Sequence, residues 1–183
     1  MNKDMRFNIE LINGLVGKKF EKYRHDQFDF TNSVTQRVGL FIGGKIYNLI
    51  NEQQSVNYFG NSEDVSVFEI EESTLDMVRS AFEDIQQIDT PVEGIITEIR
   101  LINENQKVSS QEDNYEVWLT RAIVFVVDGR EITFEKDNVP FSEEITIIKG
   151  YSTEERLSDE SDFLEGWDET KVPECYREKV ILK

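Results

Sequence analysis

The sequence has few of the residues on which common catalytic and metal sites depend. It contains one cysteine, Cys175, and one histidine, His25. A lone cysteine cannot form an internal disulfide or a multi-thiolate zinc site, and a lone histidine cannot build a histidine-rich metal site. A catalytic triad would have to use His25, which follows a predicted strand in a polar stretch typical of an exposed loop. We therefore expect no metal, no cofactor and no catalytic residue.

Long apolar runs and phosphate-binding glycine motifs are also missing. The longest apolar run, Ala122 to Val127, is far shorter than the roughly 18 residues that a membrane helix needs. Residues 1–10 carry four charged side chains and lack the apolar run of a secretory signal. Gly14 and Gly17 precede Lys18 without phosphate-loop spacing, so they predict only a turn before a strand. These absences predict a cytoplasmic protein that does not bind membranes.

Acidic side chains dominate the composition. There are 37 acidic and 20 basic residues, which gives a formal net charge of -17. Such a surface repels nucleic-acid phosphates and anionic membranes, and it attracts a basic protein partner. The alternative explanation is that the acids simply keep the protein soluble.

Two segments of the chain resemble each other. Val38–Leu49 and Ile123–Phe134 each contain an apolar run, a two-residue turn signal and an alternating run. The turn signals, Gly43-Gly44 and Asp128-Gly129, favour tight hairpins because these residues tolerate positive φ. We interpret the 183 residues as one compact body with an internal duplication, whose copies span residues 7–72 and 91–151. Two β-meanders can also look alike at this level without a duplication.

The fold class predicted from these patterns is α+β, mainly antiparallel β. It has two pseudo-repeated β-meander modules joined by a helix, plus a C-terminal docking segment at residues 152–183. The linking helix, residues 73–89, is predicted from four apolar side chains at helical spacing before Thr90-Pro91 (Leu75, Val78, Phe82 and Ile85). Another strand is the competing prediction for this stretch. The polar segments 51–64 and 104–114 are predicted to be loops.

The C-terminal segment mixes acids with aromatic side chains. From Tyr151 to Glu169 it holds eight acids against one base, Arg156, yet it also contains large apolar anchors. We expect it to dock, with a short helix near Ser161–Trp167 and a last strand or arm over Val172–Leu182. The candidate partner-binding residues are Asp162, Phe163, Trp167, Asp168 and Glu169. The alternative is that the aromatics only pack the segment onto the core while the acids face water.

In general style the chain is similar to small acidic strand-rich bacterial proteins, some of which are immunity proteins that neutralise a toxin. The similarity lies in the Gly17–Lys22 segment and in the Asp128-Gly129 turn, and it carries over no functional residue. The function best supported by the sequence is a non-enzymatic acidic interaction module that binds a basic protein, in an inhibitor or immunity-like role. The alternatives are a carboxylate-based hydrolase or transferase with its site between the two modules, and a nucleic-acid mimic.

Overall fold

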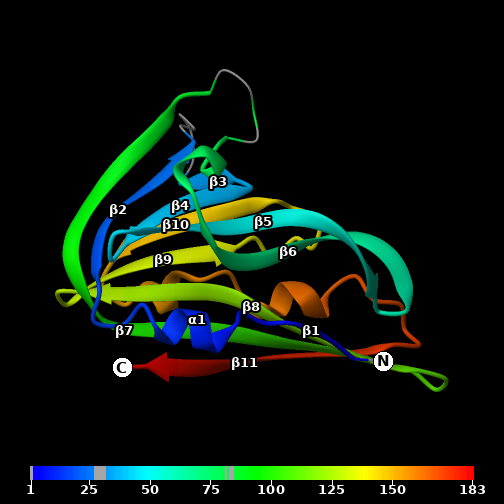
Figure 1. Cartoon of the computed structure of the whole chain (residues 1–183). Coiled ribbons are helices and arrows are strands. Elements are labelled where there is room, and N and C mark those ends of the chain that lie inside the picture. Colours follow the sequence, from blue (N-terminus) through cyan, green and yellow to red (C-terminus); the bar gives the residue numbers. More distant parts are fainter. Residues whose placement is uncertain (1, 27–31, 81, 83–84) are drawn as a thin grey trace.

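The computed structural model of the chain describes residues 2–26, 32–80, 82 and 85–183, and its architecture is one large, nearly all-antiparallel sheet (Figure 1). The strands are β1 (Asn2–Met5), β2 (Lys19–Asp26), β3 (Ser33–Thr35), β4 (Arg37–Ile42), β5 (Lys45–Tyr58), β6 (Asn61–Ser73), β7 (Gln87–Ser109), β8 (Asn114–Val127), β9 (Arg130–Lys136), β10 (Glu144–Gly150) and β11 (Val172–Leu182). The helical elements are one short α-helix, α1 (Ile9–Asn13), and three 3-10 turns, η1 (Leu75–Met77), η2 (Thr153–Arg156) and η3 (Glu160–Leu164).

The strand pairings form a closed circuit. Strand β10 pairs with β3, which runs through Gln36 into β4, and β4 pairs with β2. The circuit continues from β2 through β7, β8 and β9 back to β10. Gln36 has a positive φ of 67°. The change of backbone direction at this residue lets β3 pair with β10 while β4, the next strand of the same segment, pairs with β2. Strands β5 and β6 extend the sheet beyond β4, β11 lies along β7, and β1 pairs in parallel with β8.

Alternating apolar side chains fill the inside of this curved sheet. Ile123, Phe125 and Val127 on β8 point to the same side as Phe134 on β9, and all four are buried. Phe20 on β2 packs edge-on against Phe125, with ring centroids 5.2 Å apart. Each buried aromatic or branched side chain stabilises the fold by roughly 1.5–3 kcal/mol. The period-two pattern of these strands is thus explained by burial in an apolar core, and a smaller second cluster lies around Val56, Val65 and Val117.

The two predicted turn pairs are confirmed as two-residue hairpin turns. Gly43-Gly44 joins β4 to β5, and Asp128-Gly129 joins β8 to β9. All four residues have positive φ, between 49° and 80°, as tight hairpins require. The duplication inferred from these hairpins stays a prediction.

The α+β prediction with a helix joining two modules is wrong. Within residues 73–89, the described part contains the last residue of β6, the short turn η1 and the beginning of β7. Leu75 is 54% exposed and Phe82 is 49% exposed, whereas Val78 is buried against Gly39. Pairing of β7 with β2 from Gln87 onwards satisfies backbone groups that a helix would otherwise satisfy internally. The β4–β5 and β8–β9 hairpins belong to one sheet because β7 pairs both with β2, next to β4, and with β8.

The two predicted polar loops are also largely strand. Residues 51–64 form the outer part of the β5–β6 hairpin, and β7 runs on to Ser109 before β8 begins at Asn114. The strand predicted over Val172–Leu182 is confirmed as β11, and η3 overlaps the first part of the region expected to be helical, Ser161–Trp167. Among the described residues, no helix is long and apolar enough to cross a membrane.

Candidate functional site

The five residues singled out from the sequence lie in and just after η3. Asp162 and Phe163 are in η3, whose first turn is capped by the Asp159 side chain, which accepts a hydrogen bond from the Ser161 amide. Trp167 follows a glycine with a φ of 83°, and its indole Nε1 donates to the Phe163 carbonyl at 2.7 Å. This bond fixes the two aromatic rings beside each other, with centroids 5.4 Å apart.

Phe163 and Trp167 pack against the turn of the β5–β6 hairpin. The ring of Phe59 lies 5.5 Å from Phe163 and 5.3 Å from Trp167, and Tyr58 contacts Phe59 at 4.5 Å. Phe59 itself has a positive φ of 49°. Pairs of this kind add about 0.5–1.5 kcal/mol beyond their buried area. The predicted aromatics therefore anchor the C-terminal segment while staying partly exposed.

The predicted carboxylates lie on the exposed side of the same segment. Asp162 accepts a hydrogen bond from the Asn138 side chain. Asp168 accepts hydrogen bonds from the Thr170 hydroxyl and amide, which lower the pKa of its carboxyl, and it forms an ion pair with Lys171 at 3.5 Å. Glu169 is exposed. The five residues therefore have two roles: the two aromatic rings pack against the rest of the protein, and the three carboxylates face water.

An open cleft of about 970 Å³ lies beside these residues. Its lining comes from the β5–β6 turn, the β7–β8 turn and the segment that precedes β11, whose elements are labelled in Figure 1. We call it the hairpin-end cleft. Its apolar and aromatic lining comes from Phe59, Val108, Tyr115, Trp167 and Val172, and its carboxylates are Glu112, Asp113 and Glu169. Lys171 is the single base among the lining residues. Acids outnumber bases in the cleft by three to one, so the cleft is suited to cationic groups.

Local turn chemistry positions the two hairpin ends. Ser110 closes the β7–β8 turn because its Oγ accepts from the Glu112 and Asp113 amides at 3.3 and 3.0 Å. Gly60, with a φ of 91°, lies so close to Tyr115 that an added Cβ would overlap the tyrosine hydroxyl. Glycine at this position therefore allows the two hairpins to approach each other.

Beneath the cleft lies a buried network of charged side chains. Glu104 is 1% exposed and Arg121 is 2% exposed. Arg121 donates to both Glu104 oxygens, at 3.1 and 2.6 Å, and Arg177 donates to Oε2 at 2.9 Å. Burial alone would raise the pKa of Glu104, but Arg121 and then Arg177 lower it to about 2. The carboxylate therefore stays charged and ties β7 and β8 to β11.

Hydrogen bonds extend this network to the β5–β6 hairpin. Gln106 donates from Nε2 to Glu104 at 2.8 Å and accepts on Oε1 from the Tyr58 hydroxyl at 3.0 Å. Arg121 also donates to the carbonyls of Lys136 and Asp137. Because Nε, Nη1 and Nη2 of Arg121 all donate to protein acceptors, we interpret the network as a positioning device for the cleft rather than as a reactive centre.

Neither Cys175, the one cysteine, nor His25, the one histidine, forms part of a nucleophilic site. Cys175 is partly buried, and burial, followed by the charge of Glu104, raises the pKa of its thiol to about 12. The thiol is therefore protonated and unreactive at neutral pH. His25, predicted to lie in an exposed loop, is instead part of β2, where its ring stacks on Tyr23 at 5.7 Å and Nδ1 lies 2.6 Å from the Asp26 carbonyl.

Sequence reasoning missed the parts of the cleft that come from other elements. Phe59 and Tyr115 were not singled out, although Phe59 precedes a glycine at a strong turn signal. Among the described residues, no group of three or more histidine, cysteine or acidic side chains is arranged to hold a metal ion. Comparison with protein-family models, with curated proteins and with solved structures finds no match to this chain.

Proposed function

We propose that this chain is a non-enzymatic binding module that engages a basic protein through the hairpin-end cleft, in an inhibitor or immunity-like role. The observation that carries the proposal is the combination of Phe59, Tyr115 and Trp167 with three carboxylates around one open cleft. Aromatic side chains supply contact area at low entropic cost, and carboxylates steer and select a cationic partner.

The surroundings of the cleft support this assignment. Asp159, Glu160 and Asp162 in and before η3 are all exposed, and no ion pair joins them to a described base. Some acids elsewhere are neutralised, as Glu98 is by Arg100 and Asp89 is by Arg24. The three carboxylates in and before η3 are not neutralised in this way, and their charge beside the cleft accelerates the approach of a basic protein.

The alternative hypothesis of a carboxylate-based enzyme gains no support from the space between the two hairpins. That space is filled by apolar side chains such as Phe20, Leu40, Phe125 and Phe134.

Trp167 provides a direct test. The chain has two tryptophans, and Trp118 packs against Tyr176 rather than in the cleft. In a Trp118→Phe background, the emission of Trp167 is followed while decalysine, or a neutral glycine-serine peptide, is added. We expect a saturable change with decalysine alone, which weakens when salt rises from about 50 to about 300 mM.

A matched pair of charge variants distinguishes the cleft from the overall charge. Glu112→Gln, Asp113→Asn and Glu169→Gln together remove the cleft carboxylates. Glu10→Gln, Glu71→Gln and Asp76→Asn together remove three exposed acids that do not line the cleft. We expect decalysine to bind about tenfold more weakly to the first variant and nearly normally to the second. Equal losses in both, or no binding to the parent protein, would contradict the proposal.

A further inference from the structure

A second cavity opens into the apolar core on another side of the sheet. Its volume is about 650 Å³, and it lies between the N-terminal half of β7 and the ends of β8, β9 and β10. We call it the side opening. It exists because β8 pairs with β7 only up to Ile96, so residues 87–95 of β7 have β2 as their partner on one edge and no β8 residue on the other. A cavity of this size is in the range of small-molecule sites.

The floor of the side opening is apolar. Tyr23 and Val127 belong to the core and are at most 5% exposed, and the partly buried Val92 and Ile132 pack against the same core. A ligand that enters the opening would therefore place its inner part against hydrocarbon and aromatic surface. Burial of an apolar group there contributes roughly 25 cal/mol per Å².

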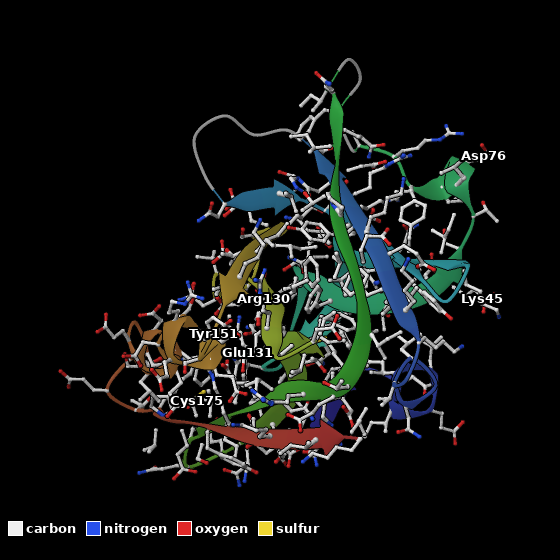
Figure 2. The ribbon with its side chains drawn as sticks, turned by 90° about the vertical axis from the view of Figure 1, so that its left-hand side faces the viewer. Lys45, Asp76, Arg130, Glu131, Tyr151 and Cys175 are labelled. Carbon is white, nitrogen blue, oxygen red and sulfur yellow. The ribbon has the colours of Figure 1, made fainter. Side chains whose placement is uncertain are left out.

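The rim of the opening carries cations on the same face as this floor. Arg130 pairs with Val127 across β8 and β9, and Lys149 pairs with Ile132 across β9 and β10. Directly paired residues point to the same side of a sheet, so both basic side chains stand over the apolar floor. Both are exposed, and neither forms an ion pair with any described residue. Figure 2 shows Arg130 beside Tyr151 at this end of the sheet.

Two acids, Glu131 and Asp128, also lie at the rim. Glu131 points to the opposite face, where its carboxylate accepts from Arg100 at 2.8 Å and from the Thr153 amide at 2.7 Å. The carboxylate of Asp128 lies against Gly94, at a position that an added Cβ would occupy. Arg156 brings a further cation to the strand end, since its Nη2 donates to the Lys149 carbonyl at 2.8 Å.

An exposed aromatic residue, Tyr151, lines the opening. Tyr151 is 70% exposed, the highest value among the large hydrophobic side chains described. It lies between Gly150, with a φ of 129°, and Ser152, with a φ of 49°. A left-handed serine costs about 1 kcal/mol or more, and such strain is concentrated at functional sites.

We propose that the side opening binds a small amphipathic anion, with its apolar body on the Tyr23, Val92 and Ile132 floor and its acidic head between Arg130 and Lys149. The ring of Tyr151 covers the apolar body of the ligand. This site is separate from the hairpin-end cleft and does not depend on the function proposed for that cleft.

Three ten-carbon probes with the same tail test the charge requirement by calorimetry: decanoate, decanol and decyltrimethylammonium. We expect decanoate to bind best. Its binding should weaken as salt rises, because the salt screens local attraction to Arg130 and Lys149. The overall charge of -17 would have the opposite effect, since screening it would strengthen anion binding.

Substitutions at the rim test whether decanoate binds in the side opening. Arg130→Gln combined with Lys149→Gln should weaken decanoate binding about tenfold. Lys3→Gln combined with Lys45→Gln changes the net charge equally at exposed positions that do not line the opening, and should leave binding unchanged. Tyr151→Ala should weaken decanoate and decanol alike. The proposal is overturned if decanoate does not bind, if the cationic probe binds equally well, or if both charge variants behave alike.

Discussion

Substitution of Glu104 by glutamine should destabilise the protein severely although it changes the side-chain shape very little. The carboxylate is 1% exposed and receives bonds from Arg121, Arg177 and Gln106. The neutral amide leaves the Arg121 guanidinium buried without a counter-charge. Removal of one partner of a buried ion pair costs about 3–5 kcal/mol.

The pKa of Glu104 gives an independent magnitude for the same interaction. Its folded-state pKa is about 2, against an ordinary value of 4.5. A depressed carboxyl pKa contributes stability that is fully present above pH 4.5 and is lost as the pH falls towards 2. At about 1.36 kcal/mol per pKa unit, the contribution is about 3 kcal/mol.

Urea unfolding at neutral pH measures the stability that the Glu104→Gln substitution removes. With an m-value of about 2 kcal/mol/M, the midpoint for Glu104→Gln should fall by about 1.5–2.5 M. Glu72→Gln is the control, because Glu72 pairs with Lys45 at the surface and should cost about 0.5 kcal/mol or less. A Glu104→Gln protein that loses less than about 1 kcal/mol would refute the reasoning.

Three further predictions concern other parts of the molecule. Burial, followed by the charge of Arg121, lowers the pKa of Lys136 to about 7 against 10.5 when unfolded, so protonation opposes folding. Wild-type stability should therefore rise between pH 7 and 10.5, and Lys136→Met should be stabilising by on the order of 2 kcal/mol at pH 6, less at pH 10, in urea titrations. The Lys171 ammonium lies 5.6 Å from the centre of the Trp167 ring and so takes a place in the cleft that a cation of the partner could occupy. Lys171→Gln should therefore tighten decalysine binding about threefold in the Trp167 assay, whereas Lys45→Gln should not. Because burial raises the pKa of Cys175 to about 12, a thiol-reactive disulfide reagent at pH 8 should modify it much faster in urea than in buffer; equal rates would contradict its assigned burial.

Local chemistry explains which features of the fold could be predicted. Gly43-Gly44 and Asp128-Gly129 form turns because their own backbone preferences suffice, and β11 alternates in exposure except at Arg177 and Glu178. The outer part of the β5–β6 hairpin was missed because three consecutive exposed polar residues, Gln53, Gln54 and Ser55, resemble a loop. Val56 and Val65 are nevertheless buried in this part of the hairpin, and this becomes evident only when the two strands are paired.

The linking helix was wrong for a related reason. Leu75, Val78 and Phe82 fit a helical stripe, but a stripe needs a surface to cover, and of these three side chains only Val78 is buried, against Gly39. The candidate site was half predictable. Phe163 and Trp167 were recognised because acids and aromatics are neighbours in sequence, whereas Phe59 and Tyr115 reach the same place only through the long hairpins.

The 23-residue strand β7 also has a consequence for how the protein is made. The first half of β7 pairs with β2, which is synthesised earlier. The second half pairs with β8 and β11, which are synthesised later, and the β11 residues follow their β7 partners by about 60 to 80 residues. During translation β7 therefore presents an open hydrogen-bonding edge, and the nascent chain needs shielding until β11 has left the ribosome.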